Sequence, residues 1–340
     1  MPFSFFRLRR STNRVRQILN VFLKYGFGKV IDQIHLSRFV PFRKRIKSFG
    51  QWPSVKEPAV AERLRMAFAE LGPSFIKLAQ ILSSRPDLIT KQYADEFKKL
   101  QDRVPPFSSD EAKQIIEQDI AKPIDQVFSR FDAAPIAAAS IAQVHYATLI
   151  DGTEVVVKVQ RPRIREQIET DVSILSFIAG LMEKYFPESA FFNPTGIVEE
   201  FTRTVRKELD FLEEARNCAR FKRNFEQDTD IHIPEVFTQY STDKIIVMER
   251  IDGVRLDDIE GITRLGLDRV KLAKIGVNAY FKQILEDGFF HGDPHAGNIF
   301  AMQTGQIAFM DLASWEGFLP NSGRPWPTPF LRLFRKTSTA

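Results

Sequence analysis

The chain has 340 residues, of which 44% are apolar, and it contains a single cysteine, Cys218. This length suffices for two domains of about 150 residues with buried cores, so the composition excludes an intrinsically disordered protein. A single cysteine also excludes an internal disulfide and a zinc site built from several cysteines, and it favours a reducing compartment.

The formal net charge of +5 is unevenly distributed along the chain. Residues 1–50 hold twelve Lys and Arg against one acidic residue, Asp32, so this segment carries +11 and the other 290 residues carry −6. Because an acidic body repels phosphate groups, the charge distribution argues against a nucleic-acid partner.

Residues 1–58 are expected to form a basic amphipathic segment. Its apolar residues at positions 15, 18, 19, 22 and 23 have helical spacing, and arginines occupy the other face. Such a helix either binds an anionic membrane surface or packs on the rest of the protein, and the sequence leaves both open. An Arg-rich, acid-poor start also resembles an organellar transit peptide. No signal peptide is visible, and the longest uncharged apolar stretch, 172–182, is about half the length of a membrane span.

Helical patterns dominate residues 59–121, and Ser108 or Ser109 before two acidic residues predicts the N-cap of a helix. The pattern then changes to three short strands, with a hairpin turn at Asp151-Gly152, followed by a long helical region with breaks at Pro187 and Pro194. The predicted ranges are 127–131, 142–149 and 154–159 for the strands and 165–224 for the helical region.

Two further strands are expected at 236–240 and 244–249, before a hinge at Asp252-Gly253. A helix at 267–287 and two short strands at 299–302 and 306–310, joined by a Thr-Gly turn, complete the pattern. This order predicts an α+β protein with five parts: the basic segment, a helical extension, a β-rich lobe with inserted helices, a helical lobe with a polar loop, and a tail. Their predicted bounds are 1–58, 59–121, 122–253, 254–311 and 312–340.

The polar loop begins at His291 and reads His-Gly-Asp-Pro-His-Ala-Gly-Asn. Asp293, followed five positions later by Asn298, is the arrangement by which phosphotransferases place a carboxylate at the attacking oxygen and an amide on a metal ion. Asp311 follows as a second metal-binding carboxylate, and such oxygen ligands suit Mg²⁺. Each piece has a structural alternative, a turn or a strand cap, so the prediction rests on their combination and order.

Lys158 lies within the apolar strand Val-Val-Val-Lys-Val. A buried lysine needs an anionic partner, and Glu214 on the following helical region is a natural one. A strand lysine paired with a helix glutamate holds the α- and β-phosphates in kinase folds. The alternative is an edge-strand lysine that faces water.

A kinase has a glycine-rich loop over the phosphates, but this chain has Ala137, Ala138, Ala139 and Ser140 at the corresponding place. Alanine disfavours positive φ, so the loop is expected to handle nucleotides differently, as in an atypical kinase.

These motifs together resemble the UbiB family, the atypical kinase-like proteins also called AarF-domain-containing kinases, over about residues 10–311. The match includes five ordered motifs: Lys-Leu-Ala-Gln at 77–80, Ala-Ala-Ala-Ser-Ile-Ala-Gln-Val-His at 137–145, Val-Val-Val-Lys-Val-Gln-Arg-Pro at 155–162, Glu-Leu-Asp at 208–210, and the polar loop at 291–298.

The resemblance implies a protein-kinase-like bilobal fold with a helical N-terminal extension. It places Lys158 on nucleotide phosphates with Glu214 as its partner, Asp293 as the catalytic carboxylate, and Asn298 and Asp311 on Mg²⁺.

In the family, the Lys-x-Gly-Gln helix covers the site where a protein substrate would dock, and the Glu-x-Asp acids secure it. Lys77, Gln80, Glu208 and Asp210 therefore imply an ATPase or a small-molecule or lipid kinase in preference to a protein kinase.

The family resemblance also implies ATP or ADP and Mg²⁺ as cofactors and a role in ubiquinone biosynthesis. The implied partners are a nucleotide, an anionic membrane surface, and quinone-biosynthesis proteins or lipid intermediates. A peripheral location on the cytoplasmic face of the inner membrane is favoured over a mitochondrial one. Two alternatives stay open: a phosphotransferase of the aminoglycoside or choline kinase type, and a non-catalytic nucleotide-binding scaffold at the membrane.

The sequence departs from the family pattern at two places. Ala79 stands where the Lys-x-Gly-Gln motif has glycine, and Leu312-Ala313 follows Asp311 where the family has Phe-Gly. The last 29 residues hold four prolines and no apolar periodicity, so the C-terminal lobe is expected to be incomplete and the activity weak or absent. Ala-Ser-Trp-Glu-Gly-Phe-Leu can be encoded by permitted codons such that one added G at the start yields Gly-Ile-Met-Gly-Arg-Phe-Leu, which is close to the family text. This predicts a truncating frameshift, and the alternative is a genuine short variant.

Overall fold

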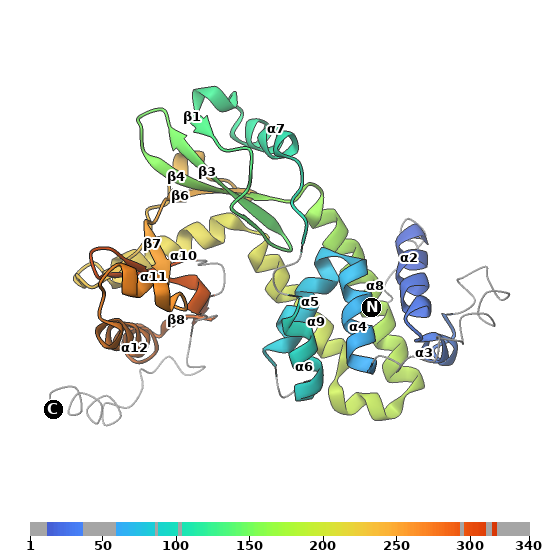
Figure 1. Ribbon diagram of the computed structural model, residues 1–340. Helices are drawn as coiled ribbons and strands as arrows, with labels where there is room; N and C mark the ends of the chain where they lie inside the picture. The colour runs from blue at the N-terminus through green and yellow to red at the C-terminus, as the bar shows by residue number, and fades with distance from the viewer. Residues whose placement is uncertain are drawn as a thin grey trace. The chain divides into compact units, whose positions relative to one another are not determined.

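The structure is a computed structural model that describes residues 12–36, 59–85, 88–100, 104–292, 296–310 and 315–317, with the backbone alone for 190–192 and 315–317. The chain divides into two compact units (Figure 1). Unit 1 comprises Met1–Ile115, Ala134–Val144 and Val159–Leu209, and unit 2 comprises Ile116–Ala133, His145–Lys158 and Asp210–Ala340.

Unit 1 is mainly helical. Phe75, Phe97 and Phe201 are fully buried at its core, and the Phe68 ring stacks on the Phe97 ring with 5.3 Å between centroids. Its elements are α2 (Thr12–Lys24), α3 (Gly28–Gln33), α4 (Val60–Leu71), α5 (Pro73–Ser83), α6 (Lys91–Lys98), the first part of α7 (Ser109–Ile120), β2 (Ala137–Ala138), α8 (Ile164–Tyr185), η3 (Pro187–Phe192) and α9 (Pro194–Glu208).

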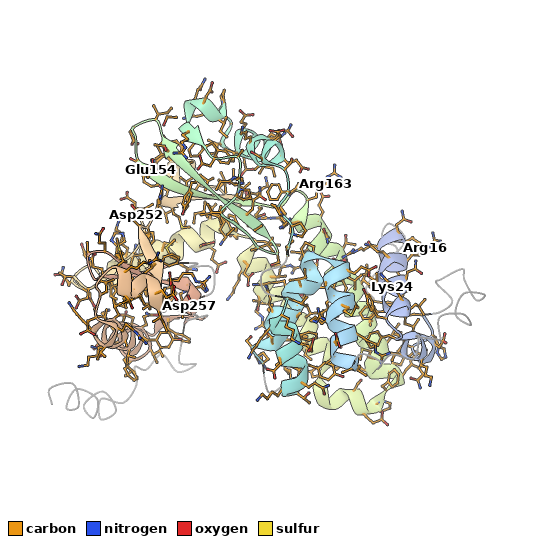
Figure 2. The ribbon with its side chains drawn as sticks, viewed as in Figure 1. Arg16, Lys24, Glu154, Arg163, Asp252 and Asp257 are labelled. Atoms are coloured by element: carbon orange, nitrogen blue, oxygen red, sulfur yellow. The ribbon has the colours of Figure 1, made fainter. Side chains whose placement is uncertain are left out.

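Helix α2 packs on α4 and α8, with Ile18 and Leu19 buried, so the structure shows the second of the two alternatives expected for an amphipathic helix here. Arg14 fixes it with hydrogen bonds of 2.7 and 2.8 Å to the fully buried Asp171. Arg16 and Lys24 are exposed on the same helix (Figure 2). No helix among the residues that the structure describes is long and apolar enough to cross a membrane.

The main sheet has the strand order β1-β3-β4-β6, and β2 pairs with β3. The hairpin between β3 and β4 turns at Asp151-Gly152, as predicted, with φ of +89° at Gly152. Helix α10 packs on β6 within unit 2. The bounds are β1 (Phe128–Phe131), β3 (Ala142–Leu149), β4 (Glu154–Gln160), β6 (Ile245–Glu249) and α10 (Phe211–Asn224), with the short helix η2 (Ile124–Gln126) before β1.

A second sheet in unit 2 has the order β5-β10-β9-β7, and β8 pairs with β11. Helix α12 packs against β8 and β10, and α11 against β7 (Figure 1). The bounds are β5 (Ile231–His232), η4 (Thr238–Tyr240), β7 (Gly253–Arg255), α11 (Ile259–Arg264), α12 (Arg269–Leu285), β8 (Phe289–His291), η5 (Ala296–Asn298), β9 (Ile299–Met302), β10 (Ile307–Phe309) and β11 (Trp315–Gly317).

Two sequence predictions in this unit are wrong. Residues 236–240 form no strand beyond a single bridge from Val236 to Met248, because the Ser241 hydroxyl and the Tyr240 amide both bond back to the Phe237 carbonyl and fold the chain into η4. Asp252-Gly253 is no hinge.

Gly253 begins β7 and lies so close to β9 that a Cβ there would be 2.7 Å from the Ala301 carbonyl oxygen. Nearby, the Arg250 guanidinium lies 3.0 Å from Glu154 and 3.4 Å from Asp252, two residues labelled in Figure 2. The glycine therefore serves close strand packing.

Candidate functional site

Lys158 and Glu214 form the ion pair that the sequence predicts. The Lys158 Nζ lies 2.9 Å from Oε2 and 3.2 Å from Oε1 of Glu214, and the two side chains are 14% and 1% exposed. The ammonium also lies 5.0 Å from the centroid of the Phe211 ring. Because its neighbours in β4 are fully buried valines, the lysine stands out as a cation held inside an apolar strand, and the edge-strand alternative is wrong.

Glu214 is positioned by the start of helix α10. Asp210 caps this helix by accepting a hydrogen bond from the Leu212 amide, and Glu214 follows in the first turn, where the helix dipole favours an anion. The sequence pattern predicts one continuous helical segment over 194–224, whereas the structure has a break between α9 and α10. An Asp followed by two apolar residues and two glutamates is the N-cap signal that could have located it.

The alanine loop forms the short strand β2 and a tight turn into β3. Ala137 and Ala138 pair with Val144 and Gln143, and the Ala139 amide donates to the Ala142 carbonyl at 2.8 Å. None of residues 137–140 has positive φ, which agrees with the expectation for alanine, and Ser140 is buried. Their role in nucleotide binding stays a prediction.

The four residues implied to cover the site are divided between the units. In unit 1, Lys77 on α5 contacts Glu208 at the end of α9 at 2.6 Å, and Gln80 follows one turn after Lys77. Asp210 lies in unit 2, where it caps α10 and contacts Arg216 at 3.4 Å. The structure thus brings Lys77 and Glu208 together and gives Asp210 a local capping role.

Ala79, the departure from the family's glycine, is fully buried on α5, so its methyl group is accommodated in the helical packing of unit 1.

Two polar residues were not predicted as positioning groups: Gln160 at the end of β4 and Arg165 in the first turn of α8. Gln160 Nε2 and an Arg165 guanidinium nitrogen each donate to the Leu209 carbonyl at 2.6 Å and so fix the chain between Glu208 and the start of α10. For Gln160, the signal was a polar residue at the end of a mainly apolar strand.

The polar loop starts and ends at fixed points in unit 2. The His291 amide donates to Gln283 Oε1 at 3.0 Å, and its carbonyl accepts from the Tyr280 hydroxyl at 3.0 Å. The Met310 amide donates to the Asn298 carbonyl at 2.7 Å, and the Met310 carbonyl lies 3.4 Å from His291 Nε2.

This hydrogen-bond set links Asn298, a predicted metal ligand, through Met310 to His291, and Met310 and His291 are chain neighbours of the predicted Asp311 and Asp293. Asp293 and Asp311 themselves lie outside the described residues. Asn298 is described, and amide and carboxylate oxygens of this kind fit a hard cation such as Mg²⁺.

Comparison with known proteins identifies the family. Residues 99–319, more than half of the chain, match the ABC1 atypical kinase-like domain. The chain is 39% identical over 288 residues to the probable protein kinase UbiB of Vibrio cholerae and 43% identical over 289 residues to that of Marinobacter nauticus. These alignments cover 84% of this chain and 53% and 52% of the relatives, so the chain spans about half the length of the curated relatives it matches.

Among solved structures, the chain is similar to Rv3197 from Mycobacterium tuberculosis, determined in a complex with erythromycin. The TM-score is 0.56 at 26% identity, over 82% of this chain and 70% of that chain. The predicted α+β, protein-kinase-like fold is confirmed. The predicted frameshift and domain boundaries stay predictions. The chain belongs to the ABC1 atypical kinase-like family, the family that its five ordered motifs indicate.

Proposed function

We propose that the chain is an ATP-binding atypical kinase or ATPase that uses Mg²⁺. The observation that carries the proposal is the Lys158–Glu214 ion pair, in which a strand lysine is held by a helix glutamate that is 1% exposed. An isolated buried ion pair is a poor stabiliser of a fold, so its presence in an apolar strand favours a binding role. In this role the Lys158 ammonium contacts the phosphates and Glu214 orients it.

The hydrogen bonds at the polar loop support the catalytic part of the proposal. They hold Met310, directly before Asp311, on the Asn298 carbonyl, and they place the Met310 carbonyl 3.4 Å from Nε2 of His291, two residues before Asp293. Asp293 would accept the proton of an attacking hydroxyl or water, and Asn298 and Asp311 would hold Mg²⁺, which neutralises phosphate charge when bound.

The Lys77–Glu208 pair supports a restriction on the acceptor. In the role that the family resemblance gives this pair, it keeps helix α5 over the position where a protein substrate would dock, which favours water, a small molecule or a lipid as acceptor. The contribution to ubiquinone biosynthesis at a membrane surface belongs to this proposal as well. It is supported by the family resemblance and by the exposed cations on α2.

The catalytic part is tested with the substitution Asp293→Asn. The wild-type chain is expected to bind Mg-ATP and to release phosphate slowly, in keeping with the weak activity expected from its sequence, whereas D293N binds Mg-ATP with similar affinity and loses this phosphate release. Binding is measured by calorimetry and phosphate by a continuous assay. Equal phosphate release by D293N would refute the catalytic role, and full complementation of a quinone-deficient strain by D293N would favour the non-catalytic scaffold.

A further inference from the structure

The alanine loop is held from outside by one arginine. The Arg161 Nε donates to the Ala139 carbonyl at 3.0 Å, and its backbone amide donates to the Ile141 carbonyl at 2.9 Å. One residue therefore binds two carbonyl groups of the turn between β2 and β3. All of these residues belong to unit 1.

The same guanidinium ties the loop to the segment before helix α7. Its Nη2 donates to the Pro105 carbonyl at 2.8 Å, and its carbon lies 5.7 Å from the centroid of the Phe107 ring, a cation–π geometry. The fully buried Gln143 forms a second link to this segment. Its Oε1 accepts a hydrogen bond from the Phe107 amide at 3.1 Å, and its Nε2 donates to the Phe107 carbonyl at 3.4 Å.

These contacts determine the direction of a backbone N–H group. A trans peptide is planar, so fixing the Ala139 carbonyl on Arg161 also fixes the Ser140 N–H, which points the opposite way. Backbone N–H groups are the donors that phosphate-binding loops present to anions. In a glycine-rich loop the backbone adapts its conformation to the ligand. This loop has no residue with positive φ, so its backbone must already have the binding conformation before the ligand arrives.

We propose that Arg161 is a positioning residue that presets the alanine loop for nucleotide phosphates through Ala139 and the segment around Pro105, without contacting the nucleotide. This inference rests on the proposed nucleotide binding. The planar guanidinium fork suits two carbonyls and a ring face at once, and a lysine ammonium matches this arrangement only in part.

The test compares Arg161→Ala and Arg161→Lys with the matched control Arg206→Ala. Arg206 is also in unit 1 and also donates two hydrogen bonds, at 2.8 and 2.7 Å, but to the exposed Glu169 on α8. Dissociation constants are measured by calorimetry for Mg-ADP and for adenosine, which has no phosphates. The exchange of the amides of 137–142 is followed by hydrogen–deuterium exchange mass spectrometry.

We expect R161A to raise the dissociation constant of Mg-ADP about tenfold and to leave that of adenosine unchanged within about twofold. The reason is that the loop is no longer preorganised for the phosphates, which adenosine lacks. R161K should lie between R161A and the wild type, R206A should match the wild type, and loop amides should exchange faster in R161A.

An equal loss of affinity for Mg-ADP and adenosine in R161A would show a merely structural role of Arg161 and overturn the inference. An unchanged affinity for Mg-ADP would overturn it as well. Unchanged loop exchange in R161A overturns it even if the wild type binds no nucleotide. If the wild type binds no nucleotide and the loop amides exchange faster in R161A, the proposed function and the phosphate role of the loop are refuted. The stabilisation of the loop by the Arg161 contacts with Ala139 and Pro105 would then still be established.

Discussion

Removing Lys158 from the Lys158–Glu214 pair should cost more stability than removing both members. Lys158→Met leaves the Glu214 carboxylate, 1% exposed, without its cation, and we expect a loss of about 4 kcal/mol. Glu214→Gln leaves an ammonium that is 14% exposed and still faces the Phe211 ring, so we expect a smaller loss of about 2 kcal/mol. The double variant K158M/E214Q should lose about 3 kcal/mol, because no unpaired charge stays buried.

The assay is urea unfolding followed by circular dichroism, with Lys222→Met as the control. Lys222 is 56% exposed and its Nζ lies 3.8 Å from Glu235, so its loss should change stability by less than about 0.5 kcal/mol. Strict additivity of the two single substitutions, or a K158M cost no larger than that of K222M, would contradict the reasoning from burial.

Three further predictions follow from contacts elsewhere in the chain. Asp171→Asn should cost about 3 kcal/mol in urea unfolding, because it leaves Arg14 without its buried anion, whereas Glu70→Gln at an exposed pair should be nearly neutral; equal costs would be inconsistent with this. Gly253→Ala should cost about 1–3 kcal/mol, since its Cβ would meet the β9 backbone, and an unchanged urea midpoint would refute the close approach. Burial lowers the pKa of His145 below 6.5, so the folded state favours the neutral ring; its contribution to stability is full above pH 6.5 and is lost as the pH falls through the folded pKa. His145→Gln should therefore flatten the stability–pH curve below 6.5, and an unchanged slope would count against that assignment.

The pattern of apolar residues located most elements of the fold. The strands at 142–149 and 299–302 have the predicted bounds, because apolar and polar residues alternate in the first, and the polar loop and the Thr304-Gly305 turn flank the second. Helix α12 (Arg269–Leu285) likewise falls within its predicted range. The break between α9 and α10 and the strand pairing of Ala137–Ala138 were not predicted, since the first depends on a single cap and the second on a tertiary partner.

The candidate site was predictable where chemistry is local to a motif. A lysine among valines requires an anion, so the Lys158–Glu214 pair could be predicted from the sequence. The Arg161 contacts could not, because they join three segments far apart in the chain through backbone carbonyls, which carry no sequence signal. The packing of α2 was equally open, since the same amphipathic pattern fits a lipid surface and a helical neighbour.

The most direct test of the central claim is calorimetric titration of Mg-ADP into the chain. We expect saturable binding by the wild type and by K222M, and none by the folded double variant K158M/E214Q, in which the buried cation and its anion are both replaced by neutral groups. Binding of Mg-ADP by K158M/E214Q with wild-type affinity would contradict the assignment of Lys158 and Glu214 to a nucleotide.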